Sequence, residues 1–397
     1  MRLLPLEYAV RNLSRSPARL VLSLLGSALV VLLILVAGGF VRGMERSLRT
    51  TGGEDNVILM SAGSEESVER SEIEAGAPGV LAASVQGIRT RAGVAFVSPE
   101  VHVMLPVQRP GSDESRNRLV MMRGVTPTAT LVHETVSIAA GRWAVSGADE
   151  IVLGRMVPTV LGFEPEAVAI GRQLMIEGRP WTIVGHFAAP GTVLEAEVWM
   201  PLTDLTTVTK RDTLSCIVLT LDPYDEATGD GAEFADVAAF TKTRPDLELV
   251  PMMEREYYGE LAAFFEPIRI VAWVTAGLIA LGGLFGGLNS TYAAFASRIR
   301  ELGTLQSLGF RRAAIVASMI QESTLATAAG GLVACAIGVL LLDGLAVRFS
   351  MGAFGLVIDQ TVVGLGFGSG LILGVAGALP PAIKCLAPPI PVALRAV

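Results

Sequence analysis

The sequence is poor in charged residues. Only 17% of its 397 residues are Asp, Glu, Lys or Arg, and the mean hydropathy is +0.54, whereas an ordinary soluble domain has about a quarter charged residues. The deficit is confined to four windows, and the long stretch between the first two has the composition of a soluble protein. This composition excludes both a purely soluble enzyme and a membrane protein made only of helices. The net charge of −7, without a basic tract, argues against a nucleic-acid partner.

Cysteine and histidine are scarce, with three residues of each. Only Cys216 lies in the middle stretch, so this stretch is expected to fold without an internal disulfide. His102, His133 and His186 lie far apart and show none of the spacings typical of a metal site. The nucleophile motif Gly-x-Ser-x-Gly is also missing. We therefore predict a non-catalytic domain that binds a partner or transmits force and holds no metal.

The sequence also lacks a nucleotide-binding loop. That loop needs a lysine after a glycine, in the motif G-x-x-x-x-G-K-[ST], but Lys210, Lys242 and Lys384 all follow other residues. If this protein does active work, we expect the ATPase to be a separate chain. ATP and magnesium would then bind that chain, and no cofactor is expected here.

The four windows with almost no charge are long enough to cross about 30 Å of hydrocarbon. They cover residues 20–41, 270–297, 313–342 and 360–383. The first window is too long for a cleavable signal peptide and is interpreted as an uncleaved anchor. Before it, Leu6, Val10 and Leu13 recur at helical spacing, which predicts an amphipathic helix within residues 1–19 on the membrane surface. An unstructured basic leader is the alternative.

Together the windows predict an α-helical membrane bundle of four helices, arranged one plus three. Between the first two helices, residues 42–266 contain short strand-like runs bounded by Gly, Pro or Ser and a few helical segments, which predict a large α/β domain. Arginines precede the first window and fill the loop 298–312, so both termini and this loop are expected in the cytoplasm. The large domain would then lie outside the cytoplasmic (inner) membrane. Arg42, Arg46 and Arg49, just after the first window, oppose this orientation.

Small residues recur every four positions in the last three spans. Gly282 with Gly286 and Gly366 with Gly370 are examples, and such spacing lets helix backbones approach closely in lipid. The pattern predicts a packed bundle or a dimer face. Glu322 is the single charged side chain within the four windows. We expect it to form an ion pair with Arg311 or Arg312, or to extend toward the water near them. The spans therefore do not resemble those of a channel or a secondary transporter.

The loop 298–312 has a short apolar face, because Ile299, Leu302, Leu305 and Leu308 repeat every three residues. Gly309 can end a helix with a positive φ. A short helix with apolar anchors suits the groove of a partner, although an ordinary membrane-surface loop would fit the periodicity equally well.

The run from Arg300 to Phe310, RELGTLQSLGF, resembles the coupling segment of FtsX-like permeases, the transmembrane subunits of MacB/LolC-type ABC systems. Other stretches agree, and they are Arg11–Arg19, Gly141–Trp143 with Asp149–Gly154, Thr182–Gly185, Val198–Pro201 and Pro388–Arg395. Thr304 and Gln306 depart from the commoner apolar and basic residues of that segment.

The resemblance implies a dimer of permeases, formed with a second copy or a paralogue, in which each permease carries a cytoplasmic ABC ATPase at the loop. It assigns the ATPase contact to Arg300, Glu301, Leu302, Gly303, Leu305, Leu308 and Gly309. Residues 267–397 would form the FtsX-like domain. The outer domain, 42–266, would be a MacB-like core with a porter-like part and a β-rich insert at about 111–201.

The function implied by the resemblance is that of a non-catalytic permease subunit of an ATP-driven export or lipoprotein-release system. ATP hydrolysis would move the outer domain by mechanotransmission, without cargo passing through the bundle. The alternative is a signalling or scaffold subunit that activates an extracytoplasmic enzyme such as a cell-wall hydrolase. A periplasmic adaptor or cargo protein and membrane lipid are further expected partners.

Overall fold

The computed structural model describes residues 6–15, 17–110, 118–224, 231–349 and 352–395. The chain forms two compact units. The membrane unit comprises Met1–Arg42, Pro267–Leu345 and Leu356–Val397, and the inserted domain comprises Gly43–Glu266 and Ala346–Gly355. Residues 1–5 and 16 of the predicted surface helix, and residues 111–117 of the predicted insert, lie outside the described residues.

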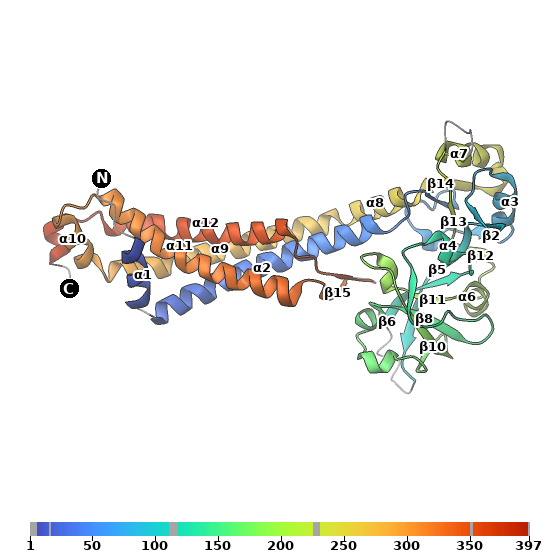
Figure 1. Ribbon diagram of the computed structural model, residues 1–397, viewed down its shortest axis with the longest axis horizontal. Coiled ribbons are helices and arrows are strands. Elements are labelled where there is room, and N and C mark those ends of the chain that lie inside the picture. The colour runs from blue at the N-terminus through green and yellow to red at the C-terminus, as the bar shows by residue number, and fades with distance from the viewer. Residues whose placement is uncertain (1–5, 16, 111–117, 225–230, 350–351, 396–397) are drawn as a thin grey trace. The chain divides into compact units, whose positions relative to one another are not determined.

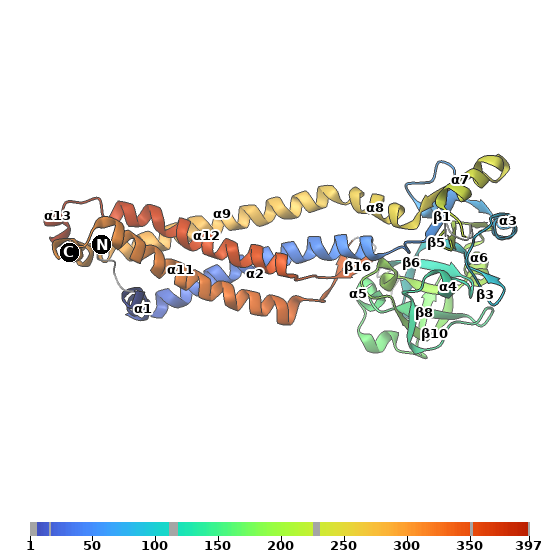
Figure 2. The same ribbon diagram turned by 45° about the horizontal axis from the view of Figure 1, so that its top comes forward.

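Four helices among the described residues are long and apolar enough to cross a membrane. They are α2 (Pro17–Thr50), α9 (Glu266–Ala296), α11 (Arg312–Ile337), which continues as a π-helical turn to Leu342, and α12 (Gln360–Cys385). Figures 1 and 2 both show α9, α11 and α12 running side by side with the first part of α2. The predicted one-plus-three arrangement is confirmed, because α2 precedes the inserted domain and the other three helices follow it.

Three short helices accompany the spans in the membrane unit: α1 (Leu6–Arg15), α10 (Ile299–Ser307) and α13 (Ile390–Leu394). α1 packs against α11, and Ala9 and Asn12 are buried, whereas Val10 is exposed. Val10, one of the three apolar residues at helical spacing, is thus open to the surroundings, and the position of α1 on the membrane surface stays a prediction.

The glycines predicted to allow close packing differ in their surroundings. A Cβ atom on Gly366 would lie 2.6 Å from Leu35 Cδ2, and one on Gly370 would lie 3.1 Å from Val31 Cγ2, so α12 needs both glycines to approach α2. Gly282 and Gly286 on α9 have no other atom within 4 Å of such a position. These two glycines therefore play no part in packing within the described chain.

One part of the inserted domain is an antiparallel sheet. Its strands follow the order β14 (Leu249–Met253), β1 (Asn56–Ser61), β13 (Cys216–Thr220) and the first half of β5 (Val97–Gln108). The helices α3 (Ala77–Ser84) and α7 (Phe234–Thr243) contribute Leu81 and Val237 to a core shared with Val57 and Leu59 of β1. Alternate residues of a strand face the same side, which explains the spacing of the two β1 residues.

The second half of β5 enters a closed ring of strands. The other members are β6 (Arg118–Val125), β11 (Val198–Pro201), β8 (Glu150–Gly154), β10 (Arg179–Ala188) and β9 (Gln173–Ile176), which pairs back with β5. β7 (Ser137–Gly141) adds to β10 outside the ring. The predicted α/β domain did not include a closed ring of strands. The ring also begins earlier than the predicted insert at 111–201, because β5 ends at Gln108.

The remaining elements of the inserted domain are short. They are α4 (Ala129–Val132), α5 (Val157–Leu161), α6 (Leu202–Thr209), α8 (Glu254–Phe264), β2 (Ile73–Glu74), β3 (Thr90–Arg91), β4 (Val94–Ala95) and β12 (Thr213–Leu214). A further antiparallel pair, β15 (Ala346–Phe349) and β16 (Gly352–Gly355), comes from the chain between α11 and α12. Ala353 of this pair is 4% exposed and belongs to the domain core, so the domain includes residues from two separate stretches of the sequence.

Candidate functional site

The loop between α9 and α11 contains the helix α10, which carries most of the predicted ATPase contacts. Gly309 follows it with φ +91°, a value that favours glycine and lets the chain turn into α11. The inward side of α10 is apolar. Leu302 is 3% exposed and packs with Phe295 and Ile315, and Ile299 and Leu305 are partly buried in the same cluster.

Gly303 lies where α10 meets α13. A Cβ atom on this glycine would be 3.0 Å from the Cβ atom of Ala393, so a larger side chain would push α13 away. Leu302 and Gly303 are both buried by the chain's own residues. In this chain they pack α10 against the membrane unit, and their direct contact with a partner stays a prediction.

The outward side of α10 has a different composition. Arg300, Thr304 and Leu308 are exposed, and their spacing of four residues places them along one face of the helix. The Leu308 side chain is 66% exposed, and Gly309 beside it is also exposed. An apolar side chain flanked by a cation offers a surface on which another protein could pack.

Arg298 fixes the start of α10 to a membrane span. Its Nε donates to Glu301 Oε2 at 2.9 Å, and its Nη1 donates to Glu322 Oε2 at 3.0 Å. Glu322 is 2% exposed and lies on α11. It was expected to pair near Arg311 and Arg312, but its partner is Arg298. A carboxylate buried within a span is costly unless it is paired, so this bridge holds α10 and α11 together.

The inserted domain contains a second concentration of charge, in its interior. Glu100 on β5 is fully buried, with Arg123 Nη1 2.6 Å from its Oε2 and His102 Nε2 3.0 Å from the same oxygen. Arg123 on β6 also makes a two-fold contact with Glu197, at 2.7 and 2.8 Å. Trp199 Nε1 donates to Glu197 at 2.9 Å. We call these residues, together with His133 and Glu254, the buried charge network.

His133 connects this network to the start of α8. Its Nε2 lies 2.7 Å from Glu100 Oε1, and its Nδ1 lies 3.7 Å from Glu254 Oε1. Glu254 in turn accepts hydrogen bonds from Gly53 N at 2.9 Å and from Asn56 Nδ2 at 2.8 Å. α2 ends at Thr50 and α8 leads directly into α9, so the network lies next to the two segments through which the first two spans enter the domain.

The network separates the proton affinities of its members. Burial would raise the pKa of Glu100, but His133 and Arg123 hold it well below its usual range. Burial would lower the pKa of His133, yet the carboxylates of Glu100 and Glu254 offset this, and the pKa is raised. Burial and the charge of Arg123 together lower the pKa of His102.

Glu100, His102 and Cys216 bring three possible metal-ligand atoms within 4.8 Å of one another. However, the Arg123 guanidinium already occupies one oxygen of Glu100. Burial also raises the pKa of the Cys216 thiol well above its usual range, which disfavours the thiolate form that binds metals. The chemistry of this group fits an ion-pair network better than a metal centre.

Comparison with known sequences assigns the family. The MacB-like periplasmic core domain matches residues 20–234, and the FtsX-like permease C-terminal domain matches residues 273–387. The chain belongs to the FtsX/MacB-type family of ABC transporter permeases.

Two curated relatives are similar over about half of this permease. It is 26% identical over 222 residues to the uncharacterized ABC transporter permease YknZ of Bacillus subtilis, covering 54% of each chain. It is 25% identical over 219 residues to the macrolide export ATP-binding/permease protein MacB of Bradyrhizobium diazoefficiens, covering 52% of this chain and 33% of that protein. The permease thus covers about half the length of YknZ and about one third of the length of MacB.

Among solved structures, the periplasmic region of MacB from Actinobacillus actinomycetemcomitans overlaps 53% of this permease and 93% of that chain. The TM-score is 0.38 at 12% identity, and the family assignment does not depend on it.

The permease sequence carried a signal for the buried charge network that spacing motifs did not detect. Glu100 and His102 lie two residues apart on β5, and Glu197 directly precedes β11, which carries Trp199. Arg123 interrupts an apolar strand. Isolated charges within strand-like runs, rather than histidine spacings, were the informative pattern.

Proposed function

We propose that this chain is the non-catalytic permease subunit of an ATP-driven ABC export or lipoprotein-release system. Its ATPase would be a separate chain that binds ATP and magnesium and docks on α10 from the cytoplasm. Both termini would then also be cytoplasmic, with the inserted domain on the other side of the membrane. Two permeases would pair, and the open side of α9 around Gly282 and Gly286 is suited to close helix packing.

The single observation that carries this proposal is the construction of α10. Its inner face is fastened to the membrane unit through Leu302, Gly303 and the Arg298 bridge, while Arg300, Thr304 and Leu308 remain exposed. A partner that moves this outer face would therefore pull on α11 as well, because a rigid helix transmits displacement to whatever is bonded to it.

The chain offers direct routes from the spans into the inserted domain. α2 continues nine residues beyond the predicted end of the first span, from position 41 to Thr50, and α8 leads without a loop into α9. Movement of the spans would then reach the inserted domain, which supports mechanotransmission rather than a pore.

The proposal is tested by affinity purification of the permease from gently solubilised native membranes, with mass spectrometry of the proteins that accompany it. We expect an ABC ATPase in equal amount, and about a tenfold loss of it in Leu308→Glu, since a central apolar contact contributes on the order of 1–2 kcal/mol. Val145→Glu is the matched control, because Val145 is 57% exposed in the inserted domain.

Equal recovery of the ATPase from Leu308→Glu and from the control would place docking elsewhere. Absence of any ATPase in several detergents would contradict the proposed function itself. Recovery of a cell-wall hydrolase with the ATPase would favour the signalling alternative over export.

A further inference from the structure

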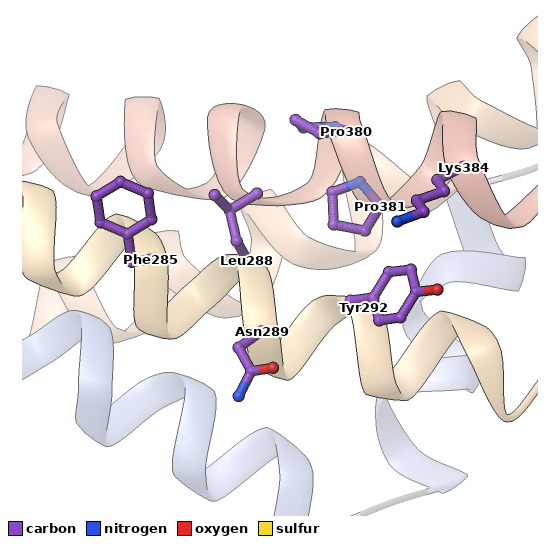
Figure 3. Close-up of a pocket in the computed structure, with 7 residues that line it drawn as sticks. All are labelled: Phe285, Leu288, Asn289, Tyr292, Pro380, Pro381 and Lys384. Carbon is purple, nitrogen blue, oxygen red and sulfur yellow. The ribbon is translucent and has the colours of Figure 1, made fainter.

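A groove in the membrane unit lies between α9 and α12, outside the α10 surface. Its volume is about 350 Å³, and it is lined by Phe285, Leu288, Asn289, Tyr292, Pro380, Pro381 and Lys384. In Figure 3, Phe285, Leu288 and Tyr292 point from α9 toward α12, and the Lys384 side chain extends toward Tyr292. Phe285 is 67% exposed, so the groove opens to the surroundings of the bundle.

Beside the groove, α9 and α12 make a close contact at Gly377. Pro381 has no N–H, so it leaves the carbonyl of Gly377 without its helical donor. Thr291 Oγ1 of α9 lies 2.7 Å from Gly377 O, so it can donate to this carbonyl in place of the missing N–H, although Gly287 O and Leu288 O of its own helix are also within hydrogen-bond distance. Gly377 also brings the backbone of α12 close to Gly287 and Leu288 of α9. The two helices are therefore in close contact next to the groove.

The polar end of the groove lies at the end of both spans. Lys384 is one residue from the end of α12, and Tyr292 is four residues from the end of α9. Lysine and tyrosine are enriched at this level of a membrane, where a charged tip can reach water. The Lys384 Nζ lies 5.3 Å from the centre of the Tyr292 ring. Phe285 is seven residues earlier, about 10 Å deeper along the helix.

The lining has one charged side chain, the cation Lys384, and no acidic residue. A cation at the interface with aromatic and aliphatic walls running into the membrane matches the chemistry of an anionic phospholipid. A transmembrane helix is a poorer fit, because helices pack in lipid against small residues, and Phe285 and Tyr292 are bulky.

We propose that this groove binds one anionic phospholipid from the leaflet at the Lys384 end of the spans. Its phosphate lies beside Lys384, and an acyl chain runs along Leu288 and Phe285. This site is independent of ATPase docking, and either conclusion can fail without the other.

The test measures lipid retained on the purified full-length permease by native mass spectrometry. The probes are phosphatidylglycerol and phosphatidylcholine with identical acyl chains, added to delipidated protein in detergent. We expect preferential retention of one phosphatidylglycerol and about a fivefold loss of that preference in Lys384→Gln, the effect of one lysine near an anionic headgroup. Arg312→Gln is the control, since Arg312 is an exposed cation beyond the same end of the spans.

A second variant tests the walls of the groove without touching the charge. Leu288→Trp fills the space for the acyl chain and should reduce retention of both lipids. Equal retention of the two lipids by the unaltered permease, or an unchanged preference in Lys384→Gln, would overturn the proposal. A disulfide-linked pair of permeases formed through Leu288→Cys would also overturn it, because a second copy would then occupy the groove.

Discussion

Arg123 is the residue on which the buried charge network depends. It is 1% exposed and contacts both Glu100 and Glu197. Arg123→Met would remove the guanidinium that pairs with both buried carboxylates, and breaking a buried ion pair in this way typically costs about 3–5 kcal/mol. We expect this loss in the free energy of unfolding of the inserted domain, measured by denaturant titration of the purified permease.

The control for this substitution is Arg255→Met, which removes an ion pair between Arg255 and Glu54, whose side chains are 62% and 81% exposed. Exposed pairs contribute little because water and salt screen them. An equal loss in the free energy of unfolding in the two variants would show that the buried charge network stabilises the domain no more than a surface ion pair does.

We expect His133 to titrate above the ordinary pKa of histidine and His102 to titrate below it. The pKa of His133 is raised and that of His102 is lowered. With only three histidines in the chain, selective ¹³C labelling gives three resonances, which His→Gln variants assign. Protonation of His102 at a higher pH than His133 would contradict the charge arrangement described here.

The sign of the stability effect follows from the same shift. Because the folded state holds the His133 proton more tightly than the unfolded state, this residue stabilises the domain most below about pH 6.5. The contribution is lost as pH rises through the raised folded-state pKa. The stability difference between the unaltered permease and His133→Gln should therefore shrink with increasing pH.

At the scale of elements, the packing of α12 on α2 depends on glycine at specific positions. Gly366→Val would place a branched side chain against Leu35 and is expected to lower the stability of the membrane unit by about 1–3 kcal/mol. Gly364→Val is the matched control on the same helix, because no atom lies within 4 Å of its added Cβ. Thermal unfolding in detergent compares them, and similar midpoints would contradict the packing described.

The elements of the membrane unit were more predictable than those of the inserted domain. A span is a local feature of about twenty apolar residues, so hydropathy alone located α2, α9, α11 and α12. The ring of strands closes through pairing of β5 with β9, residues far apart in sequence, and nothing local specifies that pairing. The same applies to β15 and β16, which join a domain that the chain left about eighty residues earlier.

The candidate site shows the same division between local and long-range information. The sequence of α10 predicted an apolar face but not which side was already occupied, since that depends on α13 at the far end of the chain. Leu302 lies on α10 and Leu308 directly follows that helix, yet the first leucine is buried and the second is exposed. Likewise, Glu322 could be recognised as unusual, but its partner Arg298 could not be chosen over Arg311 or Arg312.

At the scale of the whole molecule, mechanotransmission requires that motion at α10 reaches the inserted domain. The Arg298–Glu322 bridge is a polar contact between the start of α10 and a span. Glu322→Gln keeps the size of the side chain and removes its charge, so it should weaken this connection while leaving Arg300 and Leu308 available to the ATPase.

The most direct measurement is hydrogen–deuterium exchange of the inserted domain in the membrane-reconstituted complex of permease and ATPase, with and without ATP. We predict that ATP changes exchange around Asn56 and in α8, where the buried charge network meets the chain leading to the spans. In Glu322→Gln the ATPase should still bind and this change should be lost. An ATP-dependent change of the same size in both proteins, or none in either, would contradict the account.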